Sequence, residues 1–175
     1  MPTPPTFTAY TPLTAAQLNQ AGLWLVKTQT VGSGVASVAV TAAFSSDYDN
    51  YLITYSGGTM SVDTALKLQM GATTTGYYGN YIYGAYTATT VLGANDNNAS
   101  AFTYGGGGAD CFAYAIIGAP FLSKPTELWS RARYATNNGN YSGVLANTTS
   151  YTGFTFIPFS GTMTGGTIRV YGYRN

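Results

Sequence analysis

Apolar and polar residues alternate along most of the chain, and the alternation is sharpest near the end, in residues 167–174. Side chains alternate across the two faces of a strand, so this run predicts a strand with two different faces. One face carries two aliphatic side chains and a glycine: Ile168, Val170 and Gly172. The other is aromatic and cationic: Arg169, Tyr171 and Tyr173. A terminal strand that carries part of the core needs earlier strands as partners, which predicts a sheet protein.

Similar alternation recurs from residue 23 onward, interrupted by turn residues, and predicts about ten strands. Before the terminal region, the clearest candidates are residues 23–31, 35–40, 50–56, 64–70, 71–86, 111–119, 126–136 and 141–150. The glycines at 32 and 34 predict a turn that joins the first two candidates into a hairpin, and residues 137–140 predict another hairpin turn. Residues 93–110 should be mainly loop, with glycines 105–108 as the most flexible part. Because no helical crossover is indicated, we expect an all-β fold, an antiparallel β-sandwich or jelly roll.

The N-terminal residues follow a different pattern. Residues 1–12 hold four of the seven prolines and predict an extended arm. A capping-box pattern begins at Thr14 and Gly22 is placed to end the helix, so one short helix should follow the arm. A helix of about two turns is not stable alone and must dock on something. We therefore expect an arm with an anchoring helix, 1–22, and a β-sandwich domain, 23–175.

The low charge of the chain narrows its partners. Charged residues make up 7% of the sequence, against about 25% in an average protein. The net charge of +1 argues against nucleic acid as a partner, and no apolar run approaches the roughly 18–20 residues of a membrane helix. A protein with so few surface charges suits an oligomer or a large assembly. The single cysteine, Cys111, lies in an apolar run and is expected to be a buried hydrophobic residue.

Catalytic chemistry is poorly supported. The chain has no histidine, which removes the usual general base and most zinc sites. Its six acidic residues show no spacing that favours a catalytic pair: Asp47, Asp49, Asp63, Asp96, Asp110 and Glu127. The Asp and Asn groups around residues 47–50 and 96–98 are more easily explained as turn residues than as a calcium site. We expect no enzyme activity and no cofactor or metal.

Two surfaces are candidates for contacts. Arg169, Tyr171 and Tyr173 form a face too aromatic and cationic for bare solvent in this chain, which predicts a subunit contact. A ligand or partner surface is predicted from aromatic and cationic residues in two other segments: Tyr81, Tyr83, Trp129, Arg131 and Arg133. Such side chains could stack on a sugar, a base or the aromatic residues of a partner.

Several strings resemble structural proteins of tailed-bacteriophage virions, of the small tail-fibre, minor tail and capsid-decoration type. They are LTAAQLN at 13–19, LVKTQTVGSG at 25–34, LANTTSY at 145–151, SGTMTGGTIRVYGYR at 160–174 and, more weakly, LKLQMGATTTGYY at 66–78. The resemblance implies a trimeric β-sandwich on the surface of a phage tail or capsid. It carries over no binding residue, and residues 85–136 match no such string.

These observations lead to two expected functions. The first is a non-enzymatic virion structural protein, a homotrimer whose residues 1–22 contact other virion proteins, acting in tail-fibre or tail-tip adhesion or in capsid decoration. The alternative is a lectin-like module that recognises polysaccharides on the host surface, with tyrosine and tryptophan rings as stacking platforms. A glycan-degrading enzyme is disfavoured by the missing histidine and the sparse carboxylates.

Overall fold

The computed structural model describes residues 12 and 22–173, which form strands in three antiparallel sheets with no helix among them. The large sheet has eight strands in the order β1-β14-β3-β9-β10-β11-β6-β7. Their bounds, in that order, are β1 (Leu23–Thr30), β14 (Thr167–Tyr173), β3 (Asn50–Ser56), β9 (Ala113–Gly118), β10 (Thr126–Tyr134), β11 (Asn137–Leu145), β6 (Tyr77–Ala85) and β7 (Val91–Ala99).

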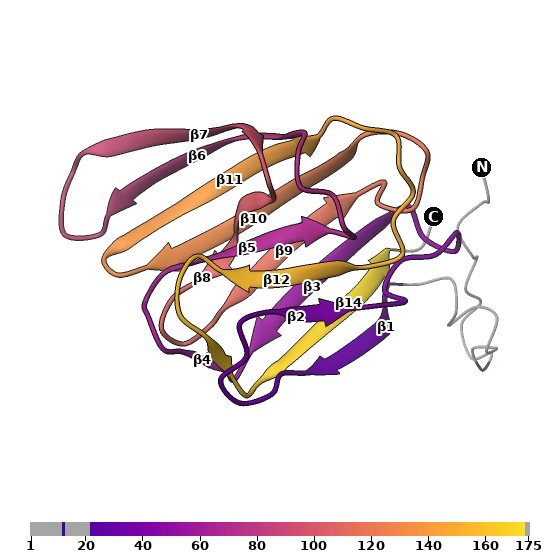
Figure 1. The fold of residues 1–175 in the computed structure, drawn as a ribbon, viewed down its shortest axis with the longest axis horizontal. Helices are drawn as coiled ribbons and strands as arrows, with labels where there is room; N and C mark the ends of the chain where they lie inside the picture. The colour runs from indigo at the N-terminus through magenta and orange to yellow at the C-terminus, as the bar shows by residue number, and fades with distance from the viewer. Residues whose placement is uncertain (1–11, 13–21, 174–175) are drawn as a thin grey trace.

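A small sheet of four strands packs on one face of the large one. Its strands are β2 (Val38–Val40), β12 (Phe154–Pro158), β5 (Ala65–Met70) and β8 (Phe102–Gly107). A third sheet consists only of β13 (Met163–Thr164) and β4 (Thr59–Met60). Figure 1 shows the small sheet in front of the large one, with the β6–β7 hairpin extending past its edge. The architecture is sandwich-like, as expected, but the strands number fourteen rather than about ten.

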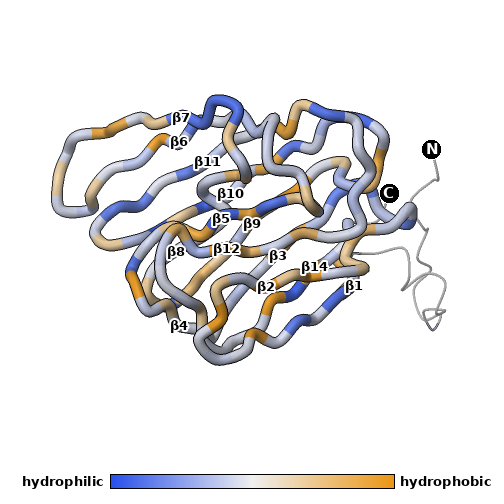
Figure 2. Tube along the Cα trace, viewed as in Figure 1, coloured by the Kyte–Doolittle hydropathy of each residue, from blue (hydrophilic) through white to orange (hydrophobic). Residues whose placement is uncertain are grey.

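The core lies between the two sheets, and hydrophobic positions occur on the strands of both (Figure 2). Ile168 and Val170 of β14 are fully buried, and Arg169 and Tyr171 on the opposite parity are half-buried, so the two-faced terminal strand is confirmed. It pairs with β1 on one side and β3 on the other. The final strand therefore lies inside the sheet and not at its edge.

Tyrosine supplies much of the core on the large-sheet side. The fully or almost fully buried rings are Tyr51, Tyr55, Tyr77, Tyr81 and Tyr141. Buried hydroxyls need partners, and these have them: the Tyr55 hydroxyl donates to the Gly165 carbonyl and the Tyr141 hydroxyl to Asp96 Oδ2, at 2.8 and 2.7 Å. Gly79 and Gly143 leave room for the Tyr141 ring, because a β-carbon at either would overlap its hydroxyl end.

The predicted hairpin of residues 23–40 is wrong. β1 pairs with β14 in the large sheet, and β2 pairs with β12 in the small sheet. The chain between them crosses from one layer to the other, held by bonds from Val31 N to Gly166 O and from Val35 N to Met163 O. A glycine-rich turn is compatible with a hairpin and with a crossing between the two layers. The crossing is favoured because it buries Val38 and Val40 as part of the small sheet.

The loop predicted for residues 93–110 is also wrong, since β7 and β8 occupy most of it. Glycines 105–108 are buried, and β-carbons at Gly105 and Gly106 would collide with Leu68 and Ala113. Glycine at these positions permits close packing of strands rather than flexibility. The turn predicted at residues 137–140 lies within β11 instead, and the β10–β11 connection contains Ala135 at a φ of 48°.

The predicted arm and helix of residues 1–22 lie outside the described residues, apart from positions 12 and 22. The described residues contain no helix that is long and apolar enough to span a membrane.

Candidate functional site

The outer face of the large sheet, turned away from the small sheet, carries most of the large apolar side chains that the described residues expose. They are Leu23, Leu25, Tyr78, Ile82, Val91, Phe112, Tyr114 and Trp129. Trp129 is 52% exposed and Tyr114 is 45% exposed. Contiguous apolar surface of this kind is typical of a binding or assembly surface.

Strand pairing aligns six of these eight side chains, all but Val91 and Phe112, in three parallel rows across seven strands, which we name after their β10 members. The Trp129 row is Leu25, Tyr171, Leu52, Ile116, Trp129, Ser142 and Asn80. The Glu127 row is Leu23, Tyr173, Asn50, Gly118, Glu127, Val144 and Tyr78. The Arg131 row is Thr28, Arg169, Thr54, Tyr114, Arg131, Asn140 and Ile82. Members of a row are direct cross-strand neighbours and contact one another.

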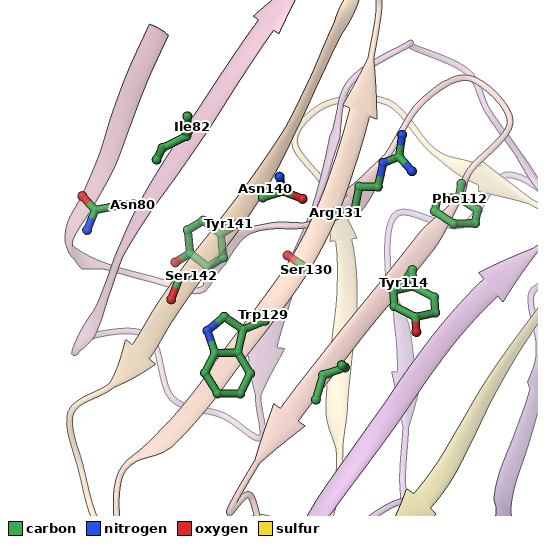
Figure 3. A pocket seen from close by; sticks show the side chains of 11 residues that line it. Asn80, Ile82, Phe112, Tyr114, Trp129, Ser130, Arg131, Asn140, Tyr141 and Ser142 are labelled. Carbon is green, nitrogen blue, oxygen red and sulfur yellow. The ribbon is translucent and has the colours of Figure 1, made fainter. Parts of the chain in front are cut away.

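A hollow of about 690 Å³ lies over part of this face, between β9 and β6. Trp129 stands near its centre, with Tyr114 and Phe112 on one side and Ile82 and Asn80 on the other (Figure 3). Its polar groups are amides, hydroxyls and one guanidinium rather than carboxylates. The hollow can therefore accept aromatic, aliphatic or hydroxyl-bearing groups, and none of its lining residues is a carboxylate.

Arg131 is held at this hollow by its neighbour on β11. Its Nε donates to Asn138 Oδ1 at 3.2 Å, and its side chain is exposed. Glu127, two positions before Trp129, is also exposed on the same face. The outer face of β10 therefore exposes an acidic residue, a tryptophan and an arginine in succession.

The predicted ligand-surface residues do not all lie together. Trp129 and Arg131 line the hollow, whereas Tyr81 is fully buried on the opposite face of the sheet and belongs to the core. Tyr83 is half-buried and stacks on Tyr81 with the ring centres 5.0 Å apart. Arg133 forms an ion pair with Asp110 at 2.5 Å, near the end of β10.

The predicted contact residues on β14 all lie on the outer face. Arg169, Tyr171 and Tyr173 are half-buried, surrounded by side chains of β1 and β3. Burial raises the pKa of the Tyr173 hydroxyl, and the nearby Tyr114 hydroxyl raises it further. The Tyr173 hydroxyl therefore stays neutral at physiological pH.

Sequence reasoning missed the contribution of β9 and β6 to the hollow. Tyr114 and Ile116 share one parity of a strand whose other parity is Ala113, Ala115 and Ile117. That difference in side-chain size marks Tyr114 as the outward residue and could have been noticed. Ile82 and Asn80 carry no such signal, because β6 has tyrosine on both faces.

Asp96 and Cys111, which lie outside this face, have structural roles. Asp96 accepts bonds from Thr103 N, Thr103 Oγ1 and the Tyr141 hydroxyl, which ties β7 to β8 and β11. Cys111 is buried, and burial raises the pKa of its thiol to about 11, so it is unreactive. Within residues 12 and 22–173, no three acidic or cysteine side chains converge where they could hold a metal ion.

The chain was compared with models of known protein families, with curated proteins and with solved structures, and none of the three comparisons found a match.

Proposed function

We propose that the chain is a non-enzymatic structural protein of a bacteriophage virion, whose β-sandwich assembles through the outer face of its large sheet. The observation that carries this proposal is the apolar, aromatic surface of the three rows on a chain with 7% charged residues. Exposed aromatic residues flanked by arginine are typical of the centres of protein interfaces. They would be a solubility liability on a free monomer.

The virion setting rests on the strings at both ends of the chain that resemble phage structural proteins. In this setting the sandwich is displayed on the tail or capsid surface, in adhesion or decoration. Residues 1–22 contact other virion proteins, and the assembly contains several copies of the chain, a trimer in the form that the resemblance implies.

The virion proposal is tested on particles. Phage particles from a host that carries the gene are purified on a density gradient, digested and analysed by mass spectrometry. Peptides of this chain should band with the particles in amounts comparable to other structural proteins. Their presence only in the soluble fraction would overturn the proposal.

A lectin-like function is the second candidate, favoured by the chemistry of the hollow. Trp129 and Tyr114 can stack on sugar rings, and Asn80, Asn140 and Ser142 can bond to sugar hydroxyls. A glycan array probed with the purified chain should then give binding at micromolar concentration that Trp129→Ala abolishes. Silence across bacterial surface polysaccharides would rule this candidate out.

A further inference from the structure

The three rows of the outer face are self-complementary. We propose that two copies of the chain pair outer face to outer face, about a two-fold axis that runs along the Trp129 row. The proposal rests on the assembly through this face that is proposed above, and it specifies the partner and the symmetry.

The geometry follows from the strand register. The two-fold axis lies between the large sheets of the two copies and runs perpendicular to their strands. It places each strand of one copy opposite the same strand of the other copy, running in the reverse direction. The Trp129 row then faces its own copy, and the Glu127 row faces the Arg131 row of the other copy. Such a contact is isologous, so every pair of residues occurs twice.

Charge favours this arrangement. Glu127 faces Arg131 of the second copy, and Tyr173 faces Arg169, where a guanidinium can lie over the ring. The ion pair detected among the described residues joins Arg133 and Asp110, so no described residue neutralises Glu127, Arg131 or Arg169 within one chain. Glu127 and Arg131 gain a partner of opposite charge only across the axis, and Arg169 gains an aromatic ring.

Shape favours it as well. Tyr114, a large outward residue of the Arg131 row, faces Gly118, which has no side chain. Two packed sheets lie about 10 Å apart with interdigitated side chains, so a bulky residue needs a small one opposite. At the far end of the same rows, Tyr78 faces Ile82, and both are exposed and apolar in the single chain.

The other simple two-fold axis is unfavourable. An axis parallel to the strands keeps each row opposite itself but reverses the strand order. Glu127 would then face another member of the Glu127 row, none of which is an arginine, and an axis over β10 would bring Glu127 against Glu127 and Arg131 against Arg131. Like charges opposed in an interface weaken association. The arrangement across the strands is therefore the one that the charges select.

The available area is sufficient. Strands about 4.8 Å apart and residues spaced about 3.4 Å give the eight-stranded face roughly 800 Å², with the strand count from the sheet order. Stable interfaces bury about 800 Å² on each partner. A two-fold contact on this face is complete in a dimer and also occurs between the trimers of a dihedral hexamer.

Charge reversal on the full-length chain tests the symmetry. Glu127→Arg and Arg131→Glu are each measured alone and together, by sedimentation equilibrium over a range of concentrations. In each single variant, residues 127 and 131 carry like charges at both of their contacts across the axis. The dissociation constant for association of two copies should therefore rise about tenfold or more. The double variant restores opposite charges at both places and should return close to the wild-type value.

Both side chains are exposed, and circular dichroism would verify that every variant is folded. The two-fold pairing is supported if the wild type forms species with an even number of copies, each single variant associates more weakly, and the double variant recovers the association. A monomer at all concentrations, a trimer as the largest species, single variants without effect, or a double variant without rescue would each overturn it. Detection in purified particles tests the virion proposal separately, so either proposal can fail while the other stands.

Discussion

At the scale of single residues, the Tyr141 hydroxyl shows how a core rich in tyrosine is stabilised. It donates to Asp96 at 2.7 Å from a ring that is almost fully buried. Hydrogen bonds to charged groups contribute about 1.5–3 kcal/mol. Tyr141→Phe should therefore lower the free energy of unfolding by about 1.5–3 kcal/mol, measured by urea denaturation. The control is Tyr86→Phe, because Tyr86 is 69% exposed; equal losses in both variants would contradict the assignment.

The same buried tyrosines predict alkaline unfolding. Burial raises the pKa of Tyr55, Tyr77, Tyr81 and Tyr141 above the ordinary value. Below about pH 10 both folded and unfolded states are protonated, so stability does not depend on these groups. Above it the unfolded chain releases protons that the folded chain keeps, and stability falls by about 1.4 kcal/mol per pH unit for each tyrosine.

Equilibrium unfolding between neutral pH and pH 11 should show this steep loss. Exposed tyrosines such as Tyr86 can ionise without unfolding. The part of the tyrosinate absorbance that comes from the buried tyrosines should appear together with loss of the circular dichroism signal and not before it. The slope should be shallower in Tyr141→Phe, which has one buried phenol fewer. Ionisation of the buried tyrosines in a fully folded protein would contradict the prediction.

At the scale of the elements, glycines within strands fix how closely neighbouring strands and rings approach. A methyl group at Gly139 of β11 would overlap the Ile82 carbonyl and lie 2.7 Å from a ring carbon of Tyr81. Gly93 of β7 has no atom within 4 Å of the same position. Gly139→Ala should cost about 1–3 kcal/mol of stability, and Gly93→Ala should cost nothing measurable. Thermal unfolding of the two variants compares them, and similar midpoints would show that β11 can shift.

Strand existence was the most predictable part of the fold. The candidates at 50–56, 64–70, 111–119 and 126–136 coincide closely with β3, β5, β9 and β10, because alternation is a local property of the sequence. Which strands pair depends on how side chains are buried between the two layers, and this is not a local property of the sequence. The predicted hairpin of residues 23–40 is wrong for that reason. The asparagine-rich and glycine-rich parts of β7 and β8 lack an apolar pattern, so the sequence predicts loop there.

At the scale of the whole molecule, the candidate site could be predicted only in part. Parity placed Arg169, Tyr171, Trp129 and Arg131 on outward faces correctly, since parity needs no tertiary information. It could not show that β14 and β10 belong to one sheet with β3 and β9 between them. The three rows exist only through that strand order, so the self-complementarity of the face lies beyond sequence reasoning.

Tryptophan fluorescence can detect whether this face is covered in solution. The chain has two tryptophans: Trp129 on the outer face and Trp24 on β1, which is half-buried. If copies associate through the outer face, raising the protein concentration transfers Trp129 from water into an apolar contact and shifts its emission to shorter wavelength. Trp24 should keep the same emission, because its surroundings are provided by its own chain.

The matched variants are Trp129→Phe and Trp24→Phe. The concentration-dependent shift should vanish in the first and persist in the second, because Phe at position 129 leaves only the emission of Trp24. Phenylalanine retains an aromatic contact at the centre of the face, so association itself should weaken rather than disappear, which sedimentation can verify. A shift that persists in Trp129→Phe would mean that copies associate near β1, at the sheet edge, and would contradict the assignment of the shift to Trp129.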